Sequence, residues 1–168
     1  LLGFGLSAFV PLSGQAQDYP VKPITIVVGY TAGGGVDQMA RILAEKLPAG
    51  LGQSVVVENK PGAGTTTGTK YVAKSPKDGY TALLTFTAHV QNPALFPNIG
   101  YDPIKDFETV SLIAKSSVIL AVSPDSPYKN MAQLMAAVKA SPGTFSYGSY
   151  GLGTTGHILG ELLKRDAG

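Results

Sequence analysis

Three glycine-rich loops are the parts of this sequence with the clearest chemical potential. They are residues 30–35, 61–68 and 151–156, and each separates a strand-like segment from a helix-like one. Glycine lets a ligand approach the backbone closely, and the free N–H groups of a helix N-terminus suit an anion. Each loop could instead be only a tight turn. Three loops in the same position favour binding, because open α/β sheets bind ligands at the carboxyl ends of their strands.

Conventional catalytic groups are sparse. His89 and His157 are the only histidines and there is no cysteine, so no ligand-spaced metal cluster is expected. His157, beside Ser149 and Thr154, could form a nucleophile–base pair, but a histidine in the first turn of a helix is more often structural. Asp37 favours the dipole of the first helix, with Arg41 one turn later as its expected partner. We therefore expect a protein that is not an enzyme, with no catalytic residue, metal or cofactor.

One alternative comes from another class of protein. Gly151–Gly156 reads G-x-G-x-x-G, which in a dinucleotide fold follows a strand and opens a helix. A nucleotide-dependent, Rossmann-like enzyme is thus the competing hypothesis, although the preceding FSYGSY is polar rather than a buried apolar run. A phosphate-binding P-loop at residues 62–70 is excluded, because Ala63 stands where that motif needs glycine and Thr69 separates Gly68 from Lys70.

Composition and the first residues indicate export. The 168 residues carry a formal net charge of +2 and no basic cluster, so we expect no nucleic-acid partner. Residues 1–17 carry no charge, and the apolar run 1–12 is too short to span a bilayer. With Gly14 and Ala16 before a cleavage point, they predict the remnant of a signal peptide and a periplasmic location. The alternative, a short buried helix, is disfavoured by Pro11 and Gly14.

Strand and helix patterns alternate from Asp18 onward. This predicts parallel βαβ units and an α/β fold. Strands are predicted at 24–28, 54–57, 80–86, 118–122 and 145–149, and helices at 39–47, around 71–72, at 131–140 with Asn130 as its N-cap, and at 157–164. Residues 92–108 are predicted to form an ordered loop.

Several segments together resemble one known family. YPVKPITIVVGYTAGGGVDQMAR, LGQSVVVENKPGAGTTTG, DGYTALL, YDPIKDFETVSLI and SPGTFSYGSYGLGTTGH follow one another from Tyr19 onward. In this order they resemble the substrate-binding proteins of tripartite tricarboxylate transporters, the Bug-type or TctC-like periplasmic receptors. The resemblance implies a type II periplasmic binding-protein fold with two α/β domains around a cleft. Residues 18–120 would form the first domain and 121–168 the start of an incomplete second one, as in a truncated receptor.

The resemblance also implies a function and a site. A receptor of this family captures a small carboxylate or related metabolite and delivers it to membrane transporter subunits; we expect it to be monomeric when complete. Its ligand would lie between residues 30–35, 62–67, 85–89 and 149–154. The expected ligand-binding residues are Tyr30, Thr31, Ala32, Gly33, Gly34, Gly64, Thr65, Thr66, Thr87, Ser149, Gly151, Gly153 and Thr154.

The first loop departs from the family pattern. Ala32 stands where these receptors commonly have proline, and Val36 where they often have a hydroxyl residue. No lysine or arginine occurs in residues 29–36, 62–69, 85–93 or 146–157. We therefore expect backbone N–H groups and hydroxyls to meet the charge of an anionic ligand.

Overall fold

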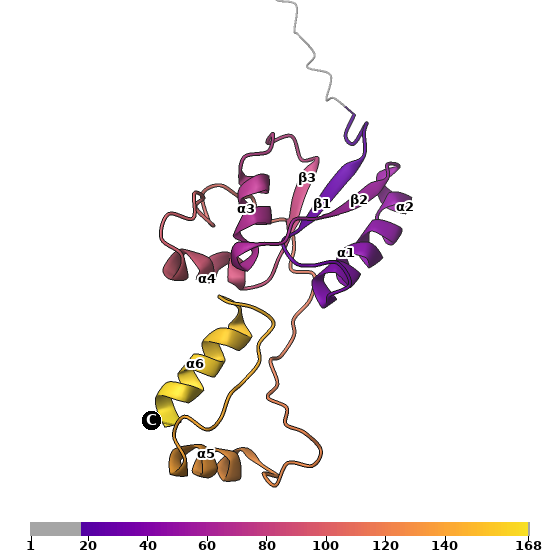
Figure 1. The fold of residues 1–168 in the computed structure, drawn as a ribbon. Helices are drawn as coiled ribbons and strands as arrows, with labels where there is room; N and C mark the ends of the chain where they lie inside the picture. Colours follow the sequence, from indigo (N-terminus) through magenta and orange to yellow (C-terminus); the bar gives the residue numbers. More distant parts are fainter. Residues whose placement is uncertain (1–17, 168) are drawn as a thin grey trace, which may run out of the picture.

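A three-stranded parallel sheet carries the first two glycine loops. The computed structural model describes residues 18–167, so the predicted signal peptide lies outside the described residues. The strands lie in the order β2-β1-β3, and Figure 1 shows them in the upper half of the molecule. They are β1 (Ile24–Val28), β2 (Val55–Asn59) and β3 (Thr81–Leu84). In register, Ile24 pairs with Val55 and Thr25 with Thr81.

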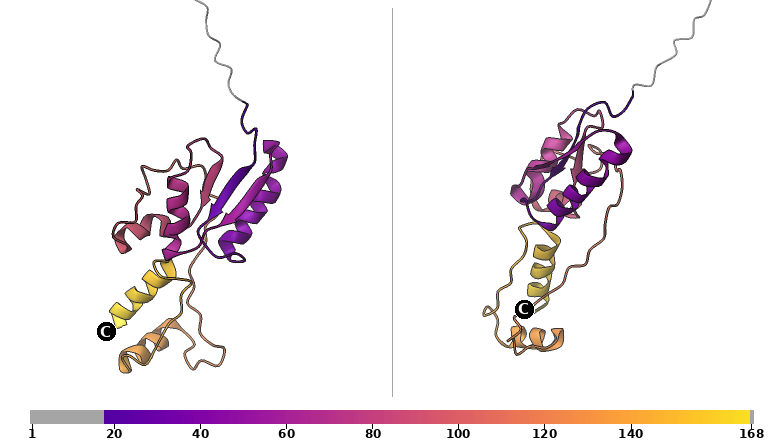
Figure 2. Two further views of the ribbon diagram at one scale, coloured as in Figure 1. Left: turned by 45° about the horizontal axis from the view of Figure 1, so that its top comes forward. Right: turned by 90° about the vertical axis from the view of Figure 1, so that its right-hand side faces the viewer.

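Helices cover both faces of this sheet (Figures 1 and 2). On one side are α1 (Gly35–Lys46) and the short α2 (Pro48–Leu51); on the other are α3 (Thr66–Ala73), which follows the 3₁₀ turn η1 (Ala63–Thr65), and α4 (Ala88–Leu95). The chain moves from β1 to β2 and then back across β1 to β3. Right-handed crossovers in opposite directions place their helices on opposite faces. The carboxyl ends of β1 and β3 therefore form a switch point of the kind that binds ligands in open α/β sheets.

The core lies between β1 and α1. It contains Ile24, Ile26, Val28, Val36, Ala40 and Val55. Because helices cover β1 on both sides, all of its residues except Thr25 are apolar. Leu43 packs against this core, but Ile42, which shares the helical spacing of the sequence pattern, is 60% exposed.

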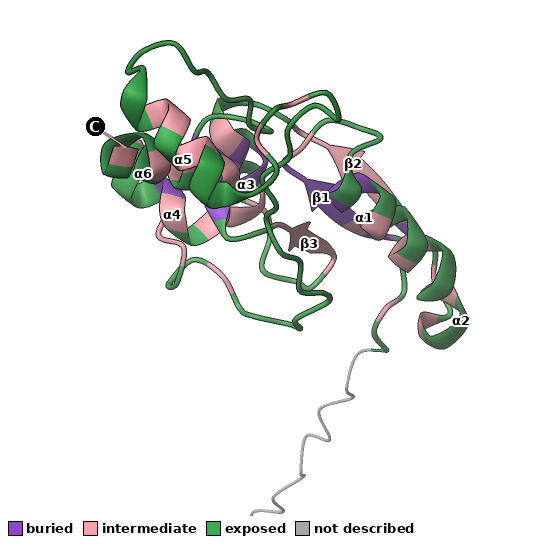
Figure 3. Ribbon diagram, turned by 90° about the horizontal axis from the view of Figure 1, so that it is seen from below, coloured by how far each residue is buried: buried purple, intermediate pink, exposed green. Residues whose placement is uncertain are grey.

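The remaining chain lies beyond the carboxyl end of the sheet. It contains α5 (Met131–Ala140) and α6 (Thr155–Ala167), and Figure 3 shows that this part is mostly exposed. The predicted N-cap of α5 is confirmed, since Asn130 Oδ1 accepts a hydrogen bond of 3.0 Å from Gln133 N. Within residues 18–167, no helix has the length and apolar character needed to cross a bilayer.

Four expectations were wrong. Residues 118–122 and 145–149 form no strand, because none of the described segments pairs with them. A β-branched run favours an extended chain, but a strand also needs a neighbour to bond its backbone. Residues 92–95 are the end of α4 rather than a loop, even with Pro93 inside it. The second half of the loop 61–68 is helical, because α3 begins at Thr66.

Candidate functional site

Parts of the three glycine loops surround one small cavity. Its volume is about 180 Å³. It lies at the carboxyl ends of β1 and β2, where the chain entering α6 returns to the sheet (Figure 1). The lining residues are Gly29, Tyr30, Thr31, Pro61, Gly62, Ala63, Gly64, Thr65, Tyr150, Gly151, Leu152 and Thr154.

The structure brings about half of the expected site residues to this cavity. Tyr30, Thr31, Gly64, Thr65, Gly151 and Thr154 line it. The others do not line it. Ala32, Gly33 and Gly34 lie farther along the first loop, and Thr66 is buried in α3. Thr87 and Gly153 contact other segments, and Ser149 Oγ lies near Gly151 N in its own segment. Tyr150, which lies between the expected residues Ser149 and Gly151, also lines the cavity but was not predicted. Its aromatic side chain next to a glycine-rich loop was the signal that could have identified it.

Asp37 fixes the shape of the first loop. Its carboxylate is 1% exposed and accepts hydrogen bonds from Gly33 N at 2.7 Å and Arg41 Nε at 2.9 Å. Asn59 Nδ2, at the end of β2, donates to Asp37 Oδ1 at 2.9 Å and to Tyr30 O at 3.2 Å. The expected Asp37–Arg41 pair is therefore present. Because the N–H of Gly33 donates to Asp37, that N–H is already used within the protein.

These donors make Asp37 unusually acidic. The hydrogen bond from Arg41, followed by those from Gly33 and Asn59, lowers the pKa of Asp37 from 3.8 to about 2. The carboxylate is thus ionised at neutral pH. Its role is to hold the loop, not to exchange protons.

The second loop has an uncommon backbone. Ala63, Gly64 and Thr65 have φ values of 44°, 62° and 79°. A β-branched residue such as Thr65 rarely adopts positive φ. The loop also packs against the first one without space for a side chain, because a Cβ on Gly29 would lie 2.9 Å from Thr65 Cβ. These contacts hold residues 62–65 at the rim of the cavity.

The third segment closes the cavity from the side of α6. Tyr150 lies against α6, and its hydroxyl accepts a hydrogen bond of 3.1 Å from Gly156 N. Thr154 Oγ1 donates to Gly151 O at 2.6 Å, and Ser149 Oγ is 3.4 Å from Gly151 N. The Thr154 hydroxyl proton is therefore used within the segment.

Helix α4 connects this third segment to the sheet. Thr87 Oγ1 lies 2.7 Å from Thr155 Oγ1, at the first residue of α6. Thr155 Oγ1 is also 3.5 Å from Gln91 Oε1. Thr87, which we expected at the ligand, thus joins two helices in this structure.

The lining of the cavity is uncharged and mixes hydroxyl groups with apolar surface. None of the described residues that line it is acidic or basic. Lys60, which immediately precedes Pro61, points elsewhere: Nζ pairs with Glu58 and lies 4.0 Å from the centre of the Tyr71 ring. Burial raises the pKa of the Tyr30 hydroxyl, so Tyr30 remains a neutral donor.

Several hydroxyl protons remain available to a ligand. A hydroxyl has one proton to donate and two lone pairs. Thr65 Oγ1 accepts from Asn92 Nδ2 at 3.3 Å, and the Tyr150 hydroxyl accepts from Gly156 N, so both keep their protons. Tyr30 and Thr31 also line the cavity, so all the hydroxyl-bearing residues around it are neutral.

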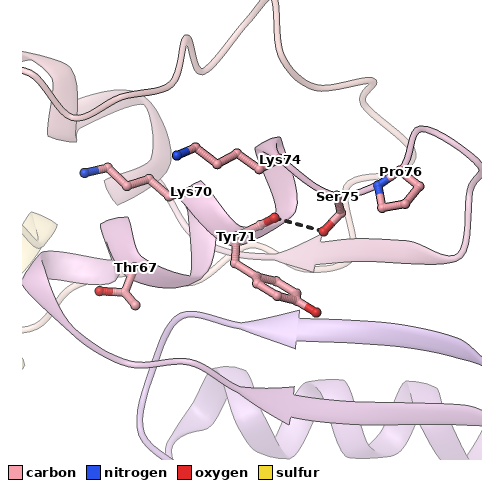
Figure 4. Close-up of a pocket in the computed structure, with 6 residues that line it drawn as sticks. All are labelled: Thr67, Lys70, Tyr71, Lys74, Ser75 and Pro76. Carbon is pink, nitrogen blue, oxygen red and sulfur yellow. Dashed lines mark hydrogen bonds between the residues drawn. The ribbon is translucent and has the colours of Figure 1, made fainter.

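A second, larger depression meets the glycine loops only at Thr67 among its lining residues. It measures about 470 Å³ and is lined by Thr67, Lys70, Tyr71, Lys74, Ser75 and Pro76. Figure 4 shows these side chains on the outer side of α3 and the turn that follows it. One helix and one turn form this surface, whereas three separate segments converge on the smaller cavity. We therefore take the smaller cavity as the candidate site.

Neither histidine has a catalytic arrangement. His89 Nε2 lies 2.9 Å from Pro103 O and its ring packs on Phe107, while His157 Nδ1 accepts from Gly153 N at 3.4 Å. His157 is thus a structural hydrogen-bonding group. Among residues 18–167, no group of three acidic or histidine side chains could hold a metal ion. The nucleotide hypothesis also loses its context, since the segment directly before Gly151 does not form a strand.

Comparisons with known proteins identify the family. The model of the tripartite tricarboxylate transporter family receptor matches residues 39–168. The chain spans about half the length of the curated relatives it matches: 44% of one that is 40% identical and 50% of another that is 41% identical.

Solved structures agree with this result. An R. palustris protein solved with adipate is 37% identical, with a TM-score of 0.80 over 88% of this chain and 50% of that one. MatC from Rhodopseudomonas palustris, with bound malate, is 32% identical, with a TM-score of 0.64 over 73% of this chain and 42% of that one. The periplasmic binding protein BugD is 34% identical, with a TM-score of 0.71 over 89% of this chain and 50% of that one.

These matches confirm the α/β binding-protein fold and point to binding proteins rather than nucleotide-dependent enzymes. The chain belongs to the family of tripartite tricarboxylate transporter receptors.

Proposed function

We propose that this protein is an extracytoplasmic receptor that binds a small carboxylate in the cavity between residues 29–31, 61–65 and 150–154. The observation that carries the proposal is the position of two helix N-termini. Thr65 and Thr154 line the cavity and directly precede α3 and α6. Helix N-termini carry partial positive charge and free N–H groups, which favour an anion.

The uncharged lining fits a carboxylate bound by neutral donors. Hydrogen bonds to a charged group each contribute about 1.5–3 kcal/mol. Three or four of them would be enough for micromolar affinity, about −8 kcal/mol, after the cost of ordering the ligand and loops. The hydroxyls of Tyr30, Thr31, Thr65 and Tyr150 supply part of this set, and backbone N–H groups supply the rest.

The similar structures support the class of ligand. One was solved with adipate and another with malate, and both of these molecules are dicarboxylates. A cavity of about 180 Å³ is below the usual range of about 300–1,000 Å³ for drug-sized ligands. It therefore suits a small metabolite of this kind.

Family membership supports the remaining parts of the proposal. The receptor acts in the periplasm as a monomer and delivers its ligand to the subunits of a tripartite tricarboxylate-type membrane transporter. The division between a first domain ending at residue 120 and a second beginning at 121 is also a proposal.

Calorimetry tests the binding function. The protein, expressed in the longest form that its gene encodes, is titrated with adipate, malate, citrate and a neutral diol of the same length as adipate. We expect micromolar binding of at least one acid and no binding of the diol. Binding of the diol with the same affinity as the acids, or of none of the acids, would contradict the proposal.

A further inference from the structure

Asn92 lies behind the cavity rather than in it. It belongs to α4, is 0% exposed, and does not line the cavity. A buried amide of this kind normally has every polar atom paired. The contacts of its Nδ2 and Oδ1 atoms therefore indicate its structural role.

On one side, Asn92 holds the strained second loop. Nδ2 donates to Gly64 O at 2.6 Å and to Thr65 Oγ1 at 3.3 Å. These are the residues at positive φ, including the β-branched Thr65 at 79°. A strained backbone persists only where its surroundings fix it. The amide of Asn92 fixes it by bonding the carbonyl of Gly64.

On the other side, Asn92 meets the third segment. Oδ1 has no hydrogen-bond partner among the described residues, and a Cβ on Gly153 would lie 3.1 Å from it. That Cβ would also lie 3.0 Å from Phe96 Cε2 at the end of α4. The second loop and the third segment thus pack against the same side chain, one at Nδ2 and the other at Oδ1. The buried Tyr101, whose pKa is raised by burial, also faces the amide and is the titratable group beside it.

We propose that Asn92 is a positioning residue that sets the spacing of these two segments and so the affinity of the site. The inference rests on the proposed function for its ligand, but the coupling of the segments can be measured without one. The amide must be neutral. A carboxylate in its place would repel Gly64 O and would add negative charge behind a site for an anion.

Hydrogen exchange tests the coupling. Asn92→Asp is compared with wild type and with Asn98→Asp, which makes the same change at an exposed residue shortly after α4. At pH 7.5 we expect Asn92→Asp to speed exchange about tenfold or more in residues 62–66 and also in residues 151–155, leaving β1 and β2 unchanged. Asn98→Asp should resemble wild type. Unchanged exchange, or faster exchange in only one of the two segments, would overturn the coupling.

Lowering the pH provides a readout that a general loss of packing would not give. Burial at this position, which is 0% exposed, would raise the pKa of an introduced carboxyl group above its ordinary value. Once protonated, the acid can donate to Gly64 O as the amide does. At pH 5, exchange in Asn92→Asp, corrected against wild type at the same pH, should therefore return toward the wild-type value, whereas Asn92→Ala should not recover. If Asn92→Asp does not fold at pH 7.5, the comparison with Asn92→Ala at pH 5 decides. Equal behaviour of the two variants would overturn the proposal.

Adipate affinity tests the consequence for binding. We expect Asn92→Asp to bind adipate about ten to a hundred times more weakly than wild type at pH 7.5, since an unsatisfied buried polar group costs about 1–3 kcal/mol. Equal affinity would overturn the role of Asn92 in binding. If wild type itself does not bind adipate, the proposed function is what fails for this ligand, and the exchange result still decides whether Asn92 couples the two segments.

Discussion

At the scale of single residues, the site depends more on backbone shape than on charged side chains. The sequence predicted which loops need glycine, but not which glycines in them have a conformation or packing that excludes a side chain. Gly34 has an ordinary φ of −74° and space for a Cβ, whereas Gly64 has a φ of 62° and a Cβ there would lie 2.9 Å from Leu152 O. That difference arises from a contact between segments 88 residues apart (152 − 64), which local pattern cannot reveal.

Comparing Gly64→Ala with a control variant should distinguish the effect of backbone strain on stability from the effect of Gly64 on ligand affinity. Gly52, at the end of α2, has a similar φ of 68° but nothing within 4 Å of its Cβ position, so Gly52→Ala is the matched control. Alanine in this conformation costs about 1–2 kcal/mol, and both variants should lose about that much stability in denaturant titrations. Only Gly64→Ala should also lose adipate affinity, by about tenfold or more. Equal affinities for the two variants would show that Leu152 does not approach Gly64 in solution.

Asp37 should make stability depend on pH below about 4. Its pKa falls from 3.8 to about 2 on folding, so its contribution is complete above the unfolded value and is lost as the pH falls through the folded one. Asp37→Asn should therefore lower Tm most at pH 5–7, and the Tm difference from wild type should shrink as the pH falls from about 4 toward 2.

The exposed Asp125 provides the control for this effect. Asp125→Asn should leave Tm close to that of wild type from pH 5 to 7. A Tm difference for Asp37→Asn that stays constant below pH 4 would contradict the bonding of Asp37 to Gly33 and Arg41.

At the scale of elements, helices with local signals were predicted best. Asn130 with Gln133 three residues later marks the start of α5, and the structure has both the cap and the helix. Strands were predicted where their partners exist, at β1, β2 and β3. Residues 118–122 have the same β-branched character without a partner and remain unpaired. Strand pairing depends on distant chain, which explains the failure.

Removing the cap should loosen α5 alone. Asn130→Ala leaves Gln133 N without its acceptor, a change that typically costs about 1 kcal/mol. Since α5 has no buried residue, little tertiary packing offsets the loss. Amide exchange of residues 131–134 should accelerate about fivefold, while Asn130→Asp, which keeps an acceptor, should not change it. Equal exchange in the two variants would contradict the role of the cap.

At the scale of the whole molecule, apolar side chains gather on a segment without secondary structure. Val110 is 90% exposed and Ile119 82%, on the extended chain that leads from the sheet to α5 (Figures 1 and 3). Exposed apolar stretches mark interaction surfaces or aggregation-prone regions. The sequence pattern predicted a strand at residues 118–122, which include Ile119, but the exposure of Val110 and Ile119 depends on the arrangement of the entire chain.

Limited proteolysis should find this segment first. A protease that cleaves after leucine or phenylalanine should cut within residues 107–120 before it cuts β1 or α1, because cleavage requires an exposed, flexible backbone. Mass spectrometry of the early fragments gives the sites. First cuts inside the sheet would show that residues 108–122 are covered in solution.

The central claim is that neutral donors in the cavity bind a carboxylate, and one calorimetric comparison tests it most directly. Adipate and adipamide have the same length, but the amide replaces charged acceptors with NH₂ groups that would face donors. Hydrogen bonds to neutral acceptors contribute about 0.5–1.5 kcal/mol instead of about 1.5–3, so three such bonds predict adipamide binding at least about a hundredfold more weakly. Lys60→Met, which removes the nearest lysine in sequence, should leave adipate affinity unchanged. Equal binding of acid and amide, or loss of adipate binding in Lys60→Met, would contradict the claim.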